Sequence, residues 1–348
     1  MLKLNSSERV SMKSDDSQIN SWEVLKQYFK EYVYPVEQVE NLAHEAFQNK
    51  RGSAWQKIQF LLFDMNLRLM REGFGLGTPR FFREWELRHL IEQLEQQYLP
   101  QEQLPPEVTS VEVFMPWLKE RISQHRVNHH PLFKLFDSDN LSDEEVRYFL
   151  ANYRVNMQRF HLHVAAFSLI VPFEMREELY HNLYDEFGQG NFAEAHPNLF
   201  EPLMDYFGGA REEDINPETC NLLNTKINLC WFADGLHYGI GGMGALELAI
   251  PLQQRRVLAH LRRRGLSEDM VKFFVVHCEL DEDHGEGWFA AGMPYMHTCE
   301  DLQKVFSAAM RMLEARAGVY DGILKGILSS RNQADNHTLC RLNALRGV

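Results

Sequence analysis

Apolar residues recur at steps of three and four along most of the chain, a spacing that places them on one face of an α-helix. In the first third, the pattern runs through SWEVLKQYFKEYV (21–33), SAWQKIQFLLFDMNLRLMREG (53–73) and RFFREWELRHLIEQLEQQYL (80–99). The loop-like stretches GFGLGTP (73–79) and LPQEQLPPEV (99–108) separate these segments. We therefore predict a helical module over residues 22–130, after a polar, Ser-rich and disordered tail over 1–21.

The rest of the chain repeats the helical pattern, and strand-like alternation is almost absent. Ser142 and Glu145 have the spacing of a capping box at a helix start. The apolar periodicity predicts helices over 142–170, 173–187, 197–207, 217–248, 252–264, 267–290 and 300–329. These segments predict an all-α fold with a main helical domain over 131–333 and a short tail over 334–348.

Composition and charge limit the classes of partner. The chain is 45% hydrophobic and 24% charged, as is typical of a globular protein, and its net charge of −13 would repel a nucleic-acid backbone. The basic run from Arg255 to Arg264 is interpreted as a solvated helix face that ends at Gly265. No segment has the length of a membrane span or the apolar core of a secretory signal. The five cysteines are odd in number and form no CxxC pair, so we expect a cytoplasmic protein without membrane or nucleic-acid partners.

The window HCELDEDH, residues 277–284, carries the first candidate chemistry. On a helix, His277, Asp281 and His284 fall within about 60° of one stripe, whereas Glu279, Glu282 and Asp283 point elsewhere. Phe273, Phe274 and Trp288 lie near the same stripe, which suggests that it faces the interior. A buried stripe of this kind needs partners, and a metal ion would suit all three groups. A hydrogen-bonded polar cluster and a solvated face remain alternatives.

Two upstream segments supply further metal-binding side chains. Glu186 ends a predicted helix, and a bend at Gly188 and Gly190 can return the chain so that His196 lies beside it. Glu247 stands alone in GGMGALELAIP, in a helix expected to end at Pro251, and no basic residue lies within one turn of it. An unpaired carboxylate among apolar residues needs a cation from elsewhere in the fold.

Together these residues form a mixed donor set of three imidazoles and three carboxylates. Bridging carboxylates with histidines suit iron or manganese better than a structural zinc site. Six ligands are too many for one catalytic ion that must keep open positions, so they favour two ions.

The order Glu, His, Glu and H-x3-D-x2-H resembles the heme-oxygenase-like diiron oxidases and oxygenases. It matches Glu186, His196, Glu247 and the motif of His277, Asp281 and His284, within the phrases NLYDEFG, EAHPNLF and GALELA. The similarity covers residues 130–330. The layout also resembles an N-oxygenase of this family from the streptozotocin pathway, without its cupin domain, in which an N-terminal helical module holds a dimer together.

The resemblance implies a heme-oxygenase-like bundle that holds two Fe ions, cycling between Fe2+ and Fe3+, and activates O2. The expected substrate is an amino acid or another amine-derived small molecule, with an external reductant and a homodimeric state. N-oxygenation in a natural-product pathway is the leading expectation. Oxidative C–C cleavage or desaturation of an amino acid or fatty acid is the alternative.

One departure from the family pattern concerns a seventh ligand. The N-oxygenases tend to supply a Glu from the first core helix, but NYRVNMQRFHLHVAAF has no acidic residue, so His161 is the candidate and a pocket-lining or hydrogen-bonded histidine the alternative. If no seventh ligand exists, the cleaving and desaturating branch is favoured. Arg154, with Tyr153, is the candidate anchor for a substrate carboxylate, and a surface ion pair is the alternative.

Three other function classes fit the sequence less well. Cofactorless proteins of the same shape, such as thiaminase-like hydrolases and pyrroloquinoline-type oxidases, would not need all six metal-binding residues. A true heme oxygenase would need one proximal histidine, which His161 could imitate, but the other residues would then be unexplained. A non-enzymatic interaction protein would leave Glu247 unexplained among apolar neighbours.

Overall fold

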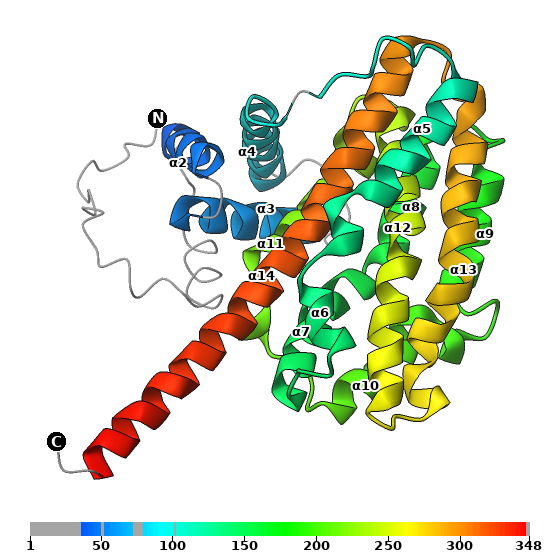
Figure 1. The fold of residues 1–348 in the computed structure, drawn as a ribbon. Helices are drawn as coiled ribbons and strands as arrows, with labels where there is room; N and C mark the ends of the chain where they lie inside the picture. The colour runs from blue at the N-terminus through cyan, green and yellow to red at the C-terminus, as the bar shows by residue number, and fades with distance from the viewer. Residues whose placement is uncertain (1–35, 50–51, 72–78, 101, 346–348) are drawn as a thin grey trace.

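The computed structural model describes residues 36–49, 52–71, 79–100 and 102–345, without the side chains at 69–71, 79–83, 279–282 and 333–345. Every regular element in these ranges is a helix, which confirms the all-α prediction (Figure 1). The tail expected over 1–21, the helix predicted from residue 21 and most of the loop GFGLGTP lie outside the described residues.

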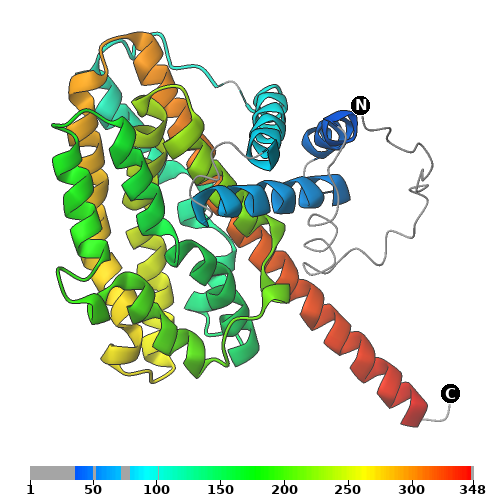
Figure 2. The same cartoon turned by 180° about the vertical axis from the view of Figure 1, so that it is seen from behind.

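The main body is a helical bundle centred on α12 (Leu236–Arg263), which packs along α13 (Glu268–Gly292) and α14 (Cys299–Leu345). Viewed from behind, the green helices α8 to α10 lie on one face of this bundle (Figure 2). The remaining helices of the body are α5 (Val111–Gln124), α6 (Leu132–Asp137), α7 (Asp143–Met157), α8 (Phe160–Ile170), α9 (Arg176–Glu186), α10 (His196–Tyr206) and α11 (Pro217–Ile227). Short 3-10 turns occupy Arg126–His129, Phe192–Glu194, Glu212–Asp214 and Met293–Tyr295, and a π-turn, η4, occupies Asn228–Phe232.

Close approaches fix the position of α12 between its neighbours. A Cβ atom at Gly241 would lie 2.1 Å from the carbonyl oxygen of Val305 on α14. On the other side, a Cβ atom at Gly285 of α13 would lie 2.7 Å from Cγ of Leu248. Both positions have room only for glycine, because the neighbouring helix comes so close. The contact of Gly285 with Leu248 places α13 directly beside the turn of α12 that carries Glu247.

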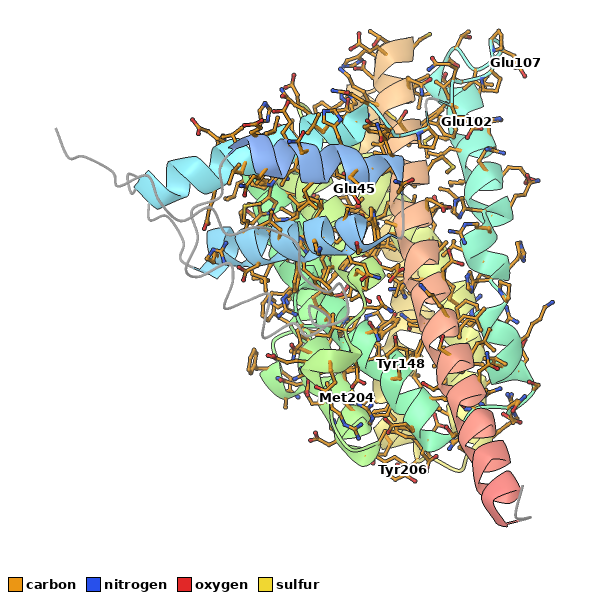
Figure 3. All side chains as sticks on the ribbon, turned by 90° about the vertical axis from the view of Figure 1, so that its left-hand side faces the viewer. Glu45, Glu102, Glu107, Tyr148, Met204 and Tyr206 are labelled. Atoms are coloured by element: carbon orange, nitrogen blue, oxygen red, sulfur yellow. The ribbon has the colours of Figure 1, made fainter. Side chains whose placement is uncertain are left out.

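The N-terminal helices α2 (Val36–Gln48), α3 (Ser53–Arg71) and α4 (Pro79–Gln96) bury a core of their own. They form a layer beside the main body (Figure 3). Buried amides join α3 to α11, where Asn66 donates to Asn224, and Asn224 donates to Gln59. By contrast, Phe114 and Leu118 of α5 belong to the main core, although the sequence division places them in the N-terminal module.

Three helix boundaries differ from those predicted. The segment 142–170 is two helices, divided at Gln158 and Arg159, and no Gly or Pro marks this break. The segment 217–248 is interrupted by η4 and by Gly235, whose φ of 118° is accessible to glycine. In the opposite direction, α12 continues through Pro251 to Arg263. Proline removes one backbone hydrogen bond, but packing against α13 and α14 keeps the helix together.

Other predicted features hold. Ser142 and Glu145 form the capping box of α7. The arginines of the basic run pair with acids at the molecular surface, as Arg263 does with Asp139 and Arg262 with Glu268, and the run ends at Gly265 with φ 81°.

The C-terminal segment differs from the prediction. Residues 334–345, assigned to a tail from the sequence, continue α14, which projects beyond the bundle (Figures 1 and 2). Among the described residues, no helix combines the length and the apolar composition that a membrane crossing requires.

Candidate metal centre

The bend after α9 brings Glu186 and His196 together, as the glycines predict. Gly188 and Gly190 have φ values of 71° and 92°, and a Cβ atom at Gly188 would lie 2.4 Å from the carbonyl oxygen of Asn191. The chain therefore turns back tightly and starts α10 at His196. There, Nδ1 of His196 donates a buried hydrogen bond of 3.0 Å to Oε1 of Glu186.

His277 of α13 completes a compact group with these two residues. Its ring centroid lies 4.2 Å from that of His196, and its Nδ1 donates at 2.8 Å to the carbonyl oxygen of Phe273. This bond leaves Nε2 as the ring nitrogen with a free lone pair. One ligand atom from each of Glu186, His196 and His277 lies within 4.8 Å of the others, and all three residues are buried.

Glu247 and His284 adjoin this group from α12 and α13. Both are buried, and the charges of His284 and Glu186 act on Glu247. Asn182 donates a hydrogen bond of 3.3 Å to Oε1 of Glu247. Nε2 of His284 donates at 3.0 Å to Oδ2 of Asp185, so Nδ1 of His284 is left free.

The protonation of these groups is strongly perturbed. Burial raises the pKa of Glu247 to about 7, and the nearby charge of Glu186 adds to this shift. Burial and the charge of His196 lower the pKa of His277 to about 3. Burial opposes ionisation of Glu186, but His196 outweighs it and lowers the pKa of this carboxyl. The pKa of His284 is raised because Glu247 and Asp185 outweigh the effect of burial.

The site contains buried polar atoms without hydrogen-bond partners. These atoms are Oε2 of Glu186, Nδ1 of His284 and Oδ1 of Asn182. Among the described side chains, no Lys or Arg forms an ion pair with Glu186 or Glu247. Such atoms are costly in a protein interior unless a ligand satisfies them, and a cation is a ligand that accepts lone pairs of this kind. The residues present therefore fit a metal site with nitrogen and oxygen donors.

The structure gathers three of the six residues that the sequence singled out, Glu186, His196 and His277, into one compact group, and Glu247 and His284 interact with this group electrostatically. Glu186, His196, Glu247, His277 and His284 come from α9, α10, α12 and α13 and are all buried. Asp281 lies on α13 between the two histidines, but its side chain is outside the described residues. As expected from the helical stripe, Phe273, Phe274 and Trp288 are buried, whereas Asp283 is exposed.

His161 lies beside the site and faces a recess. Its ring contacts Phe187 edge-on with centroids 5.0 Å apart, and its Nδ1 is buried without a partner. The charge of Glu186 acts on it, but burial dominates and lowers its pKa. The recess, of about 420 Å³, is also lined by Phe187, Phe192, Ala195 and Pro197, which are chain neighbours of Glu186 and His196. His161 is not part of the compact group of three, and its role as a seventh ligand stays a prediction.

Arg154 and Tyr153 diverge on α7. Arg154 donates from Nε to Oε1 of Glu201 at 2.7 Å, and both side chains are about one third exposed. Tyr153 is buried and accepts a hydrogen bond of 2.8 Å from Gln254. The arrangement matches the alternative of a surface ion pair, and the substrate-anchoring role of Arg154 stays a prediction.

Three residues near the site were missed from the sequence. Asp185 and Asn182 support His284 and Glu247, and both lie on α9 within one turn of Glu186. This spacing is the signal that could have identified them. Lys226 is fully buried on α11, and the charges of Glu247 and Glu186 act on it. Its sequence context, NTKINLCW, does not distinguish a buried lysine from an exposed one.

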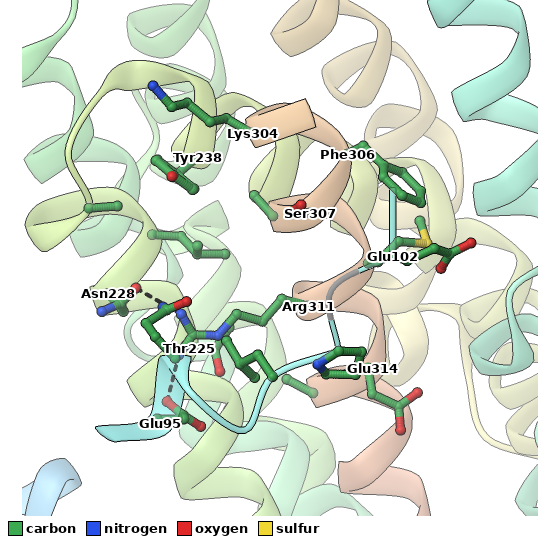
Figure 4. Close-up of a pocket in the computed structure, with 18 of the residues that line it drawn as sticks. Glu95, Glu102, Thr225, Asn228, Tyr238, Lys304, Phe306, Ser307, Arg311 and Glu314 are labelled. Carbon is green, nitrogen blue, oxygen red and sulfur yellow. Dashed lines mark hydrogen bonds and ion pairs between the residues drawn. The ribbon is translucent and has the colours of Figure 1, made fainter. Parts of the chain in front are cut away.

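A larger cavity, of about 980 Å³, lies elsewhere, between α4, α11 and α14 (Figure 4). Its most prominent cation is Arg311, which donates to Asn228 at 3.0 Å and to Glu95 at 2.6 Å. Glu314 at its edge is paired with Arg126. Arg311 and Glu314 thus already have charged partners, unlike Glu247 at the metal centre, for which no ion pair with a Lys or Arg is found among the described side chains.

Comparison with known proteins gives a family match and a curated relative. Residues 147–317 match the family described as iron-containing redox enzymes. A 4-chloro-allylglycine synthase from Streptantibioticus cattleyicolor is 21% identical over 190 residues, which cover 53% of this chain and 73% of that protein.

Solved structures share the fold. A CadD-like protein of unknown function from Nostoc punctiforme aligns with a TM-score of 0.54 and 16% identity over 62% of this chain and 97% of its own. A TenA homologue from Pseudomonas syringae aligns with a TM-score of 0.51 and 13% identity, over 64% of this chain and 98% of its own. A domain with a heme-oxygenase-like fold from Shewanella denitrificans aligns with a TM-score of 0.50 and 15% identity, over 64% of this chain and 93% of its own. At these identities, the likeness shows the fold alone. The match assigns residues 147–317 to the iron-containing redox enzyme family, and the fold is heme-oxygenase-like.

Proposed function

We propose that this protein is an O2-dependent non-heme diiron enzyme that oxidises an amino acid or another amine-derived small molecule. The observation that carries the proposal is the buried group of Glu186, His196 and His277, adjoined by Glu247 and His284, with unsatisfied lone pairs and no cationic side chain paired to its carboxylates among the described residues.

The donor set supports two ions. Glu186 lies with His196 and His277 in one group, and Glu247 interacts electrostatically with both Glu186 and His284. Glu186, His196 and His277 would hold one ion, and Glu247 and His284 the other, with Asp281 as the sixth ligand. Iron with such ligands supplies redox chemistry with O2.

The residues of the chain prepare the site for that chemistry. Asp185 holds the tautomer of His284 in which Nδ1 carries the free lone pair, and the carbonyl of Phe273 does the same for Nε2 of His277. Phe273 and Trp288 are fully buried beside these histidines and exclude water from them. We infer that a small molecule enters at the recess lined by His161, Phe187 and Phe192, because the lining includes chain neighbours of Glu186 and His196.

Carbon oxidation, by desaturation or C–C cleavage, is the branch that we favour. The relative from Streptantibioticus cattleyicolor is named for forming an unsaturated amino acid. In addition, α8 carries no carboxylate that could serve as the seventh ligand expected of an N-oxygenase. The candidate for that position in this chain is His161 instead. N-oxygenation, suggested by the N-terminal helical module, is the second candidate.

The test is a reaction of the Fe(II)-loaded protein with O2 and a panel of L-amino acids and amines, with an external reductant present. We expect O2 uptake that depends on one class of substrate, and a product that has lost two hydrogens or a carbon fragment. A product that gains oxygen on nitrogen would replace this branch by N-oxygenation. No O2 uptake by a protein shown to hold two irons, with any member of the panel, would contradict the proposed substrate class.

A further inference from the structure

Lys226 is a buried cation without a carboxylate partner among the described residues. Its side chain is fully buried on α11, and its Nζ donates a hydrogen bond of 2.5 Å to Oδ1 of Asn156. Nζ also lies 4.6 Å from the centroid of the Phe160 ring. An amide oxygen and an aromatic face compensate an ammonium charge only in part, and two of its three N–H donors remain available.

Charges on both sides act on this ammonium group. Burial and the fully buried Arg316 lower the pKa of Lys226 to about 7, whereas Glu247 and Glu186 oppose that shift. The carboxylates that favour the charged form of Lys226 are therefore those of the metal centre. When metal ions neutralise these carboxylates, Lys226 loses this compensation, and its need for another anion grows.

His163 adds a second unsatisfied group at the same place. It is fully buried on α8, and neither of its ring nitrogens has a hydrogen-bond partner. Burial and the charge of Lys226 hold its pKa well below the usual value, so it is a neutral imidazole with one N–H donor. Hydrogen-bonding groups that the fold leaves unused thus lie between α7, α8 and α11. They belong to Lys226, His163 and Asn156.

We propose that Lys226, with His163 and Asn156, binds the carboxylate of an α-amino acid substrate beside the metal centre. This inference rests on the proposed function and names the group that recognises its substrate. One ammonium group and neutral donors match a single carboxylate, which would restore charge balance once metal is bound. Arg154, the anchor suggested by the sequence, is already paired with Glu201 at the surface.

The experiment uses the full chain loaded with Mn(II), so that binding is measured without turnover. The probes are L-allylglycine, L-norvaline and the proteinogenic L-amino acids, each beside its carboxamide and its decarboxylated amine. Two readouts are recorded, the thermal unfolding midpoint and the Mn(II) electron paramagnetic resonance spectrum. The variants are Lys226→Met and Asn156→Asp, and the control is Lys304→Met, which removes a lysine that is paired with Glu300 at the surface.

We expect at least one amino acid to raise the midpoint and change the spectrum, whereas its amide and amine do not. In Lys226→Met, the apparent Kd should rise on the order of 10- to 100-fold, because a buried charge-assisted hydrogen bond is lost. Asn156→Asp should weaken binding similarly while retaining the fold, because the new carboxylate would form an ion pair with Lys226. Lys304→Met should bind as the wild type does.

Three results would overturn the inference. One is equal binding of the amino acid by the wild type and both variants, and another is equal binding of acids, amides and amines. The third is no effect of any amino acid on the wild type. If the wild type carries two metal ions and gives one of these results, the inference fails and the proposed function stands. If the wild type does not bind metal, the inference and the proposed function both fail.

Discussion

Nε2 of His284 lies 3.0 Å from Oδ2 of Asp185, and this contact leaves Nδ1 of the same ring buried without a partner. A carboxylate that accepts one ring N–H orients the imidazole and increases the basicity of the other nitrogen. Asp185 thus acts through His284, as a positioning residue, and its neighbour Glu186 belongs to the donor group itself.

Replacing Asp185 by Ala should weaken metal binding about 10- to 100-fold, the usual cost of removing such a supporting contact. Competition with a coloured chelator measures the affinity. Asp205→Ala, at an exposed position of α10, serves as the control and should bind metal normally. Equal affinities in the two variants would show that Asp185 does not position His284.

The metal-free protein should be stabilised by Glu247→Gln at neutral and higher pH. The folded-state pKa of Glu247 is raised from 4.5 to about 7, so the unfolded chain ionises first and stability falls as pH rises across this window. Each pKa unit corresponds to about 1.4 kcal/mol, so the gain at pH 8 should be on the order of 3 kcal/mol and should vanish below about pH 4.5.

Denaturant unfolding at pH 4.5 and pH 8 measures this difference. With metal present the order should reverse, because the wild type retains a carboxylate ligand that the variant lacks. A Glu247→Gln variant that is less stable than the wild type in both states would show that Glu247 is held by a structural partner.

Gly188→Ala should disrupt the bend that joins Glu186 to His196. The positive φ at Gly188 costs about 1–3 kcal/mol for alanine, and the new Cβ atom would also meet the carbonyl of Asn191. Gly209→Ala is a matched control, since its φ of 79° imposes a similar strain and nothing lies within 4 Å of a Cβ atom there. Thermal unfolding and metal titration should show the larger loss in Gly188→Ala. Equal losses of both quantities would mean that the tight bend does not build the site.

His161→Ala should retain the full metal content, because Glu186, His196 and His277 converge without His161. The exposed His129 provides the control substitution. Elemental analysis of both variants decides the question. Loss of metal from His161→Ala alone would make His161 the seventh ligand and would strengthen the case for N-oxygenation.

The sequence revealed those parts of the site that local geometry determines. His277 and His284 share a helical stripe, and two glycines returned the chain from Glu186 to His196, so helix angles and turn chemistry sufficed. Pro251 was misleading, because tertiary packing of α12 carries the helix past it.

Partners distant in sequence could not be predicted. The pairing of Arg154 with Glu201 and the burial of Lys226 beside Asn156 depend on how α7, α10 and α11 pack. A lysine in an apolar segment has the same local pattern whether its ammonium group reaches solvent or the interior. The structure is therefore needed to distinguish a surface cation from an anchoring one.

The central claim is that the buried carboxylates and imidazoles hold two iron ions in each chain. Anaerobic loading with Fe(II), removal of unbound metal and elemental analysis measure the ratio directly. We predict two irons per wild-type chain and a marked loss in Glu186→Ala and His277→Ala variants that retain their helical circular dichroism. A wild-type ratio near zero or one, or an unchanged ratio in these variants, would contradict the account.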